Sequence, residues 1–108
     1  MFTIPSVTTE TFDQEVLGSD DTTLVEFWAE WCGPCRAVTP VLEQIAKEDH
    51  PGFRIVKINS DDNPEIAARY RVLSIPTMKV FKNGDVVKTM VGAKPSAAFK
   101  AELAPYLS

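Results

Sequence analysis

Both cysteines of this 108-residue chain lie in one short segment, Trp31-Cys32-Gly33-Pro34-Cys35-Arg36. Residues three apart at a helix start share one face, with Cβ atoms about 5–6 Å apart, close enough for a disulfide to form and open. An almost unbroken apolar run, Leu24–Ala29, precedes the segment, and a stripe at helical spacing follows it: Val38, Val41, Leu42, Ile45 and Ala46. A thiol pair between a buried strand and a helix start is typical of a redox site.

The helix start should make the two sulfurs inequivalent. Cys32 precedes the helix, beside free backbone N–H groups and the positive end of the helix dipole, which favour a thiolate. Cys35 lies one turn further, on the face that carries Val38 and Leu42, so we expect it to point toward the core. The sequence thus predicts an exposed nucleophile at Cys32 and a buried resolving thiol at Cys35.

The residues around the thiols should tune their chemistry. A histidine between the cysteines would add a positive charge, stabilise the reduced thiolate and make the pair an oxidant. Gly33 and Pro34 add no charge, so we expect a comparatively strong reductant. Trp31 offers an amphipathic ring at an exposed edge, which suits docking of partners.

A buried charge pair is predicted behind the thiols. Glu26 interrupts the apolar run, and a buried carboxylate is costly unless it is paired or protonated. Lys57 lies in a second apolar strand that we expect to neighbour the first. Burial should raise the pKa of Glu26 and an ammonium group should lower it. The carboxyl could accept the proton of Cys35 during resolution; the alternatives are a purely structural ion pair or a side chain that reaches solvent.

Composition narrows the possible partners. The net charge of −4 argues against nucleic acid or an anionic membrane as partner. The sequence has no apolar stretch long enough to span a bilayer, and Met1–Glu10 does not resemble a secretory signal. Two cysteines are too few for a stapled secreted scaffold, so we expect a reducing cytoplasm. No helix shows a large apolar face beyond the core positions, so we expect a monomer. A zinc site would need His50, the only histidine, and a carboxylate beside the cysteines, and it stays an alternative.

Strand-like and helical segments alternate along the chain. The predicted strands are a short one at Phe2–Pro5, two central ones at Leu24–Ala29 and Phe53–Ile58, and a hairpin formed by Thr77–Phe81 and Val86–Val91. Asn83-Gly84 between the last two is a strong turn signal. Strand–helix–strand units predict parallel pairing, and the hairpin adds an antiparallel edge.

Four helices are predicted between and after these strands. The first is capped by Thr8 or Thr9 and ends at Gly18. The second covers residues 33 to 48, with Pro34 in its first turn and Pro40 as an internal kink. The third starts at Asn63-Pro64-Glu65, where the Asn63 side chain would cap it, and the fourth near Pro95.

Taken together, these features resemble the thioredoxin family. The likeness runs from near Thr9 to the C-terminus, and its most specific part is the line Phe27–Cys35. Further matching pieces are Pro40, Lys57-Ile58-Asn59, Ile75-Pro76-Thr77, Phe81-Lys82-Asn83-Gly84 and Gly92. The resemblance implies an α/β thioredoxin fold, three-layer α/β/α, with a mixed sheet of four to five strands and about four helices. We expect it to form one domain over residues 1–108.

The resemblance also implies an activity. Members of the family reduce disulfides in client proteins and are recharged by a flavoprotein, thioredoxin reductase, that draws on NADPH. We expect no metal or cofactor of the chain's own. Pro76 matches a cis-proline that faces the thiols, and the backbone of Ile75 should pair with an extended client chain. Trp31, Val91, Gly92 and Ala93 should form the rim of the docking surface.

One site residue departs from the family pattern. Position 26 is usually aspartate, and Glu26 is one methylene longer and a slightly weaker acid. Its carboxyl could lie closer to Cys35 or turn toward Lys57. Two other functions stay open: a binding or accessory module of the same fold whose thiols are dispensable, and a disulfide oxidase or isomerase.

Overall fold

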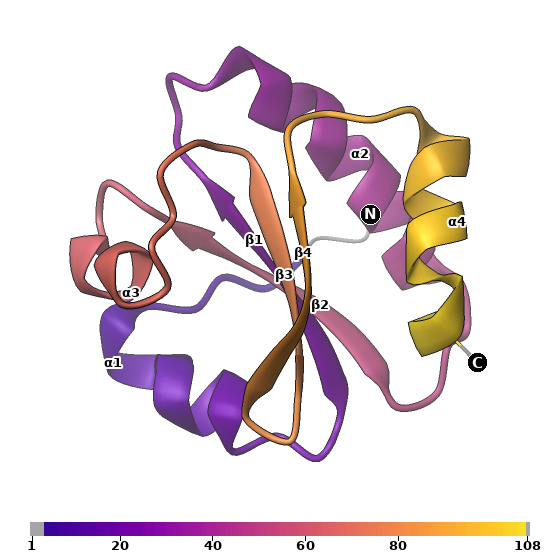
Figure 1. Ribbon diagram of the computed structural model, residues 1–108, viewed down its shortest axis with the longest axis horizontal. Helices are drawn as coiled ribbons and strands as arrows, with labels where there is room; N and C mark the ends of the chain where they lie inside the picture. The colour runs from indigo at the N-terminus through magenta and orange to yellow at the C-terminus, as the bar shows by residue number, and fades with distance from the viewer. Residues whose placement is uncertain (1–3, 108) are drawn as a thin grey trace.

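Residues 4–107, which the computed structural model describes, fold around a four-stranded sheet in the order β2-β1-β3-β4 (Figure 1). Strand β1 (Thr22–Trp28) pairs in parallel with β2 (Phe53–Asn59) and antiparallel with β3 (Thr77–Lys82). Strand β4 (Asp85–Val91) completes the sheet antiparallel to β3. The predicted mixed sheet with a closing hairpin is therefore confirmed.

Helices cover both faces of this sheet. α2 (Gly33–Lys47) and α4 (Ser96–Leu107) lie on one side, on the right in Figure 1. On the other side lie α3 (Pro64–Arg69) and the short α1 (Thr9–Phe12), which continues into a π-helical turn, η1 (Asp13–Leu17). The arrangement is the expected three-layer α/β/α sandwich.

The alternation of side chains along β1 divides the core into two clusters. Leu24 packs with the α2 and α4 side, together with Val38, Leu42, Phe99 and Leu103. Val25 and Phe27 pack with the opposite side, which includes Phe12, Val16, Ile66 and Phe81. Glu26 stands between these two residues in the strand and therefore faces the α2 layer.

The direction of β3 corrects the prediction that every strand–helix–strand unit is parallel. The α2 helix has fifteen residues, about 22 Å of rise, so it returns the chain along the whole length of the sheet. The α3 helix has six, about 9 Å, which is too short for that return. The chain consequently enters β3 at the end where β1 and β2 finish, and Thr77 pairs with Phe27.

The outer edge of β2 is covered by the N-terminal segment. Lys57 donates its N–H to the Pro5 carbonyl and accepts from Val7 N–H, both at 2.9 Å. The short strand expected at residues 2–5 lies partly outside the described residues, and Ile4 and Pro5, its described part, form no strand. The next residue, Ser6, makes an isolated bridge to Lys57. Among the four strands β2 is an edge strand, not the central one we predicted.

Local signals at two predicted elements are confirmed. α2 continues through Pro40 as a single helix, and Asn83 and Gly84 both have positive φ, at 54° and 83°, as a tight hairpin turn requires.

The predicted side-chain cap at Asn63 is wrong. Asn63 precedes α3, but its side chain instead accepts the Thr9 N–H at 2.8 Å and donates to the Asn59 carbonyl. This side chain ties α1 to the end of β2.

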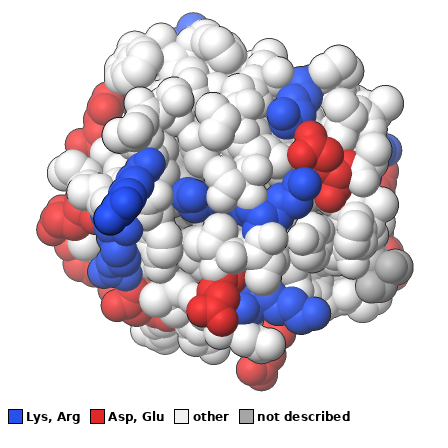
Figure 2. Space-filling model, in the orientation of Figure 1, with Lys and Arg blue, Asp and Glu red and all other residues white. Residues whose placement is uncertain are grey.

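The surface has no extended field of one charge on the face shown in Figure 2. There, basic side chains are interrupted by uncharged ones and bordered by acidic ones. In the part of the chain that the structure describes, no helix combines the length and the apolar character needed to cross a membrane.

Candidate functional site

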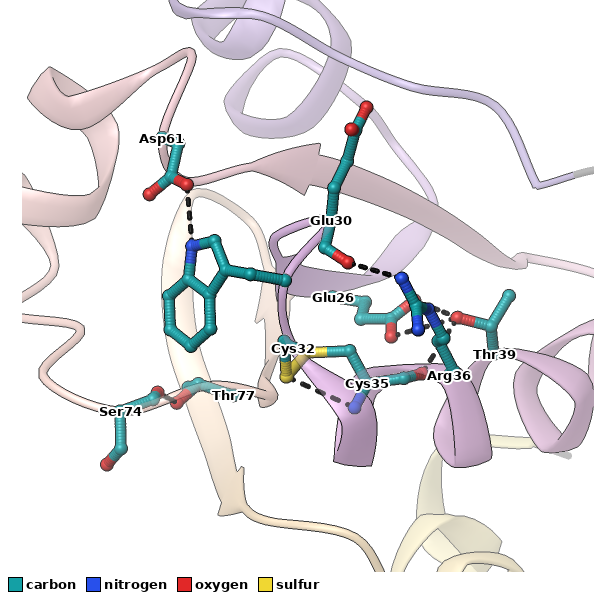
Figure 3. The surroundings of a disulfide bond; sticks show 10 residues. Glu26, Glu30, Cys32, Cys35, Arg36, Thr39, Asp61, Ser74 and Thr77 are labelled. Carbon is teal, nitrogen blue, oxygen red and sulfur yellow. Dashed lines mark hydrogen bonds between the residues drawn. A yellow bond between two sulfur atoms is a disulfide. The ribbon is translucent and has the colours of Figure 1, made fainter.

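The thiol pair lies where β1 passes into α2. Cys32 and Cys35 are joined by a disulfide, with Cα atoms 5.3 Å apart. Cys32 is the N-cap residue of α2, and its Sγ accepts the backbone N–H of Cys35 at 3.2 Å (Figure 3). Pro34 occupies the first turn, where an N–H would have no partner in the helix. The sulfur of Cys32 thus takes the place that a hydroxyl or carboxylate oxygen usually takes at a helix start.

The exposures of the two cysteines correct the sequence prediction. Cys32 and Cys35 are each only 2% exposed, so in the disulfide form Cys32 is not the more exposed of the two residues. The closed ring holds the Cys32 sulfur against the first turn of α2, and Cys32 N–H donates to the Ala29 carbonyl at 3.1 Å. The two sulfurs differ instead in position: one caps the helix and the other belongs to its first turn.

The predicted proximity of Glu26 and Lys57 is confirmed by the sheet register, in which the two residues are direct partners. Glu26 is completely buried, and burial raises the pKa of its carboxyl to about 7. The Thr39 hydroxyl and the charge of Lys57 oppose that rise, whereas Glu43 adds to it. Among the described residues the two side chains form no ion pair within 4 Å; the Lys57 ammonium lies 5.2 Å from the Trp28 ring centroid.

Thr39 is a site residue that sequence analysis missed. Its hydroxyl lies 3.3 and 3.5 Å from the two carboxyl oxygens of Glu26 and 3.1 Å from the Cys35 carbonyl oxygen (Figure 3). The signal was available, because Thr39 follows Cys35 by four residues and must share its helix face. The apolar stripe that predicts α2 does not include a threonine, so hydrophobic periodicity alone does not single it out.

A cleft of about 390 Å³ opens beside the disulfide. It is lined by Trp28, Cys35, Arg36, Thr39 and Lys57, among others. The guanidinium of Arg36 donates to the carbonyl of Glu30, another lining residue, at 2.7 Å. Cys35 and Thr39, which contacts Glu26, both line this cleft.

The expected docking residues occupy three separate segments. Trp31 is 71% exposed, and its indole N–H donates to Asp61 at 2.7 Å. The Ile75–Pro76 bond is cis, and the Pro76 carbonyl accepts the N–H of Gly92 at 2.8 Å. Val91, next to Gly92, is 52% exposed. The hydrogen bond brings two of these segments together.

Two further features of this surface were not singled out from the sequence. Leu73, two residues before Ile75, is 95% exposed, and no pattern in the sequence distinguished it from a core leucine. Asp61 fixes the orientation of the Trp31 ring from the loop after β2. A contact between residues thirty apart in the chain leaves no local signal.

The alternative of a zinc site is not supported by the arrangement of side chains. His50 lies beyond the far end of α2, where its ring nitrogens contact Glu48 at 2.9 Å and the Leu107 carbonyl at 3.0 Å. Within residues 4–107, histidine, cysteine, aspartate and glutamate side chains form no group of three or more that could hold a metal.

The buried carboxyl predicts how stability depends on pH. The native state holds the Glu26 proton more tightly than the unfolded chain, whose carboxyl titrates near 4.5, so the free energy of unfolding should fall as pH rises from about 4.5 to about 7. The fall attributable to this group is roughly 3 kcal/mol. Urea unfolding of the oxidised protein and of Glu26→Gln across this range measures it. Equal pH slopes in the two proteins would contradict the assignment.

Comparisons with known proteins agree with this architecture. The family model described as Thioredoxin matches residues 3–105. A thioredoxin of Porphyra purpurea is 49% identical over 105 residues, covering 97% of this chain and 98% of that protein. A thioredoxin of Streptomyces clavuligerus is 55% identical over 96 residues, 88% of each chain, and thioredoxin 1 of a Nostoc strain is 48% identical over 94% of each. With its Cys32–Cys35 disulfide at the start of α2, the chain belongs to the thioredoxin family and is a thiol–disulfide oxidoreductase.

Proposed function

We propose that this protein reduces disulfides in client proteins, with Cys32 as the attacking thiolate and Cys35 as the resolving thiol. The observation that carries the proposal is the hydrogen bond from Cys35 N–H to Cys32 Sγ at the start of α2. A donor at a helix N-terminus stabilises negative charge on this sulfur more than on one within the helix. Gly33 and Pro34 bring no charge that would make the pair an oxidant.

The exchange runs in two displacements. The Cys32 thiolate attacks one sulfur of a client disulfide, forms a mixed disulfide and releases the first client thiolate. Cys35 then loses its proton and attacks the Cys32 sulfur, which releases the second client thiolate and closes the Cys32–Cys35 disulfide. Two electrons pass to the client. The 5.3 Å between the Cα atoms lets this ring close without large backbone movement.

Glu26 is the proposed proton acceptor for Cys35. It faces the α2 layer, and Thr39 contacts both its carboxyl and the Cys35 carbonyl. With a pKa of about 7 the carboxyl is divided between its two protonation states near neutral pH, which suits a group that takes and releases a proton. We also propose that four residues tune the reactivity of the thiol pair: Gly33, Pro34, Lys57 and Pro76.

Recharging is proposed to come from thioredoxin reductase, a flavoprotein that uses NADPH. Client and reductase would dock on the surface formed by Trp31, Ile75, Pro76, Val91, Gly92 and Ala93. Support comes from the exposed Trp31 and Val91, and from Gly92, whose φ of +87° and missing side chain allow close approach. We further propose a monomer with one domain, over residues 1–108, working in a reducing cytoplasm.

Cysteine variants test the proposed roles. In an insulin reduction assay driven by NADPH and a matching reductase, Cys32→Ser should lose all turnover, because no nucleophile is left. Cys35→Ser should attack once and accumulate as a mixed disulfide with insulin, visible by mass spectrometry. Accumulation of that adduct by Cys32→Ser instead would reverse the roles. If the double serine variant kept the biological role of the protein, the chain would be a binding module.

Replacement of the carboxyl tests the proposed base. Glu26→Gln should slow resolution of a preformed mixed disulfide by about 10²-fold at pH 7, because the proton acceptor is lost. In the native protein that rate should rise with pH through about 7 and then level off, as Glu26 becomes ionised. Glu26→Asp keeps a carboxyl and serves as the matched control. Stopped-flow measurement of product release gives the rate, and an unchanged rate in Glu26→Gln would end the base role.

A further inference from the structure

The hydroxyl group of Thr39 lies between Glu26, the proposed proton acceptor, and the backbone of Cys35, the proposed resolving residue. Thr39 Oγ1 is 3.3 Å from the nearer carboxyl oxygen of Glu26 and 3.1 Å from the Cys35 carbonyl oxygen. Both acceptors are reached from a single position of the side chain, so choosing between them requires only rotation of the O–H bond. Figure 3 shows Thr39 on α2 with its oxygen directed toward Glu26.

The two hydrogen bonds compete, because a hydroxyl carries a single proton. An ionised Glu26 has no proton to give, so Thr39 must donate to the carboxylate and leave the Cys35 carbonyl. A protonated Glu26 can instead donate to the Thr39 oxygen, which frees the Thr39 proton for the Cys35 carbonyl. The protonation state of Glu26 therefore decides which bond forms.

The Cys35 carbonyl lies at a weakened point of α2. The next carbonyl, that of Arg36, would normally accept an N–H from residue 40, but Pro40 has none. The first turn of the helix consequently has fewer backbone bonds than an ordinary helix start. A side-chain bond from Thr39 to the carbonyl four residues earlier tends to bend a helix, and a turn that lacks one backbone bond resists such bending less.

We propose that Thr39 is a positioning residue that couples the ionisation of Glu26 to the helical turn that carries Cys35. Its hydroxyl donates to Glu26 while the carboxylate is ionised, and to the Cys35 carbonyl once the carboxyl is protonated. The inference rests on the proposed role of Glu26 as proton acceptor, and it adds Thr39 as the residue that positions the carboxyl relative to Cys35.

Other charged groups face Glu26 but cannot replace this link. Lys57 approaches from β2 and Glu43 from the next turn of α2, and both act on the carboxyl through charge alone. In the reduced protein the Cys35 thiol is a further titratable neighbour on the same helix. Thr39, by contrast, makes one hydrogen bond to Glu26 and another to the carbonyl of Cys35, the residue that carries the resolving sulfur.

Three threonine variants test the inference. Thr39→Val keeps the shape of the side chain and removes the hydroxyl, so Glu26 loses a donor to its ionised form. We expect its pKa to rise by about one unit, a ten-fold lower acid dissociation constant. Thr39→Ser restores the hydroxyl and should return the pKa to the native value. Thr23→Val is the matched control, because Thr23 is buried on the same strand as Glu26 but its hydroxyl faces the Asp21 carbonyl.

The measurement is a carboxyl ¹³C NMR titration of Glu26 in the oxidised protein, followed by the pH profile of mixed-disulfide resolution. Thr39→Val should shift the midpoint of that profile upward by the same unit, and it should have no effect in a Glu26→Gln background. An unmoved Glu26 pKa in Thr39→Val, or one that Thr39→Ser fails to restore, would overturn the inference. Because this titration needs no turnover, it gives its answer even if Glu26→Gln shows that the carboxyl is not the base.

Discussion

The free N–H groups at the start of α2 are the constraint on which the site depends. A helix must satisfy them, and here the sulfur of Cys32 accepts the N–H of Cys35. The disulfide holds the two Cα atoms 5.3 Å apart, and the hydrogen bond gives the two sulfurs unequal surroundings and favours charge on the first one. Burial alone makes no such distinction, since both cysteines are 2% exposed. Position relative to the helix end therefore carries the asymmetry that dithiol exchange requires.

The sheet contributes a second constraint, the burial of the Glu26 carboxyl in β1. β1 is buried on both faces, and a carboxyl placed in it cannot be solvated, so Glu26 holds its proton to a pKa of about 7. This arrangement costs stability at neutral pH, and the chain compensates it only in part, through Thr39 and the charge of Lys57. A carboxyl that was fully paired would keep a pKa near or below its ordinary value and would be a weaker base for the proposed proton transfer from Cys35. Incomplete compensation is what suits the group to proton transfer.

Much of this could be predicted from local sequence, because the relevant physics is local. Pro34 at a helix start, Asn83-Gly84 at a hairpin and the apolar stripe after Cys35 each act within a few residues. That Glu26 and Lys57 would lie on neighbouring strands followed from two apolar strands flanking one helix, whereas the register that makes them direct partners is seen only in the structure. The direction of β3 did not follow, since it depends on α3 being too short to span the sheet. The burial of Cys32 and the Thr39 contacts depend on packing between elements, which periodicity does not report.

The central claim is that the start of α2 stabilises a thiolate at Cys32 and not at Cys35. The most direct test is the rate of alkylation of the reduced protein by iodoacetamide as a function of pH, resolved by peptide mass spectrometry. The account predicts that Cys32 reacts first, with a pKa below the ordinary thiol value of about 8.5, and that Cys35 lags behind. Equal rates at the two cysteines, or an ordinary pKa at Cys32, would contradict it.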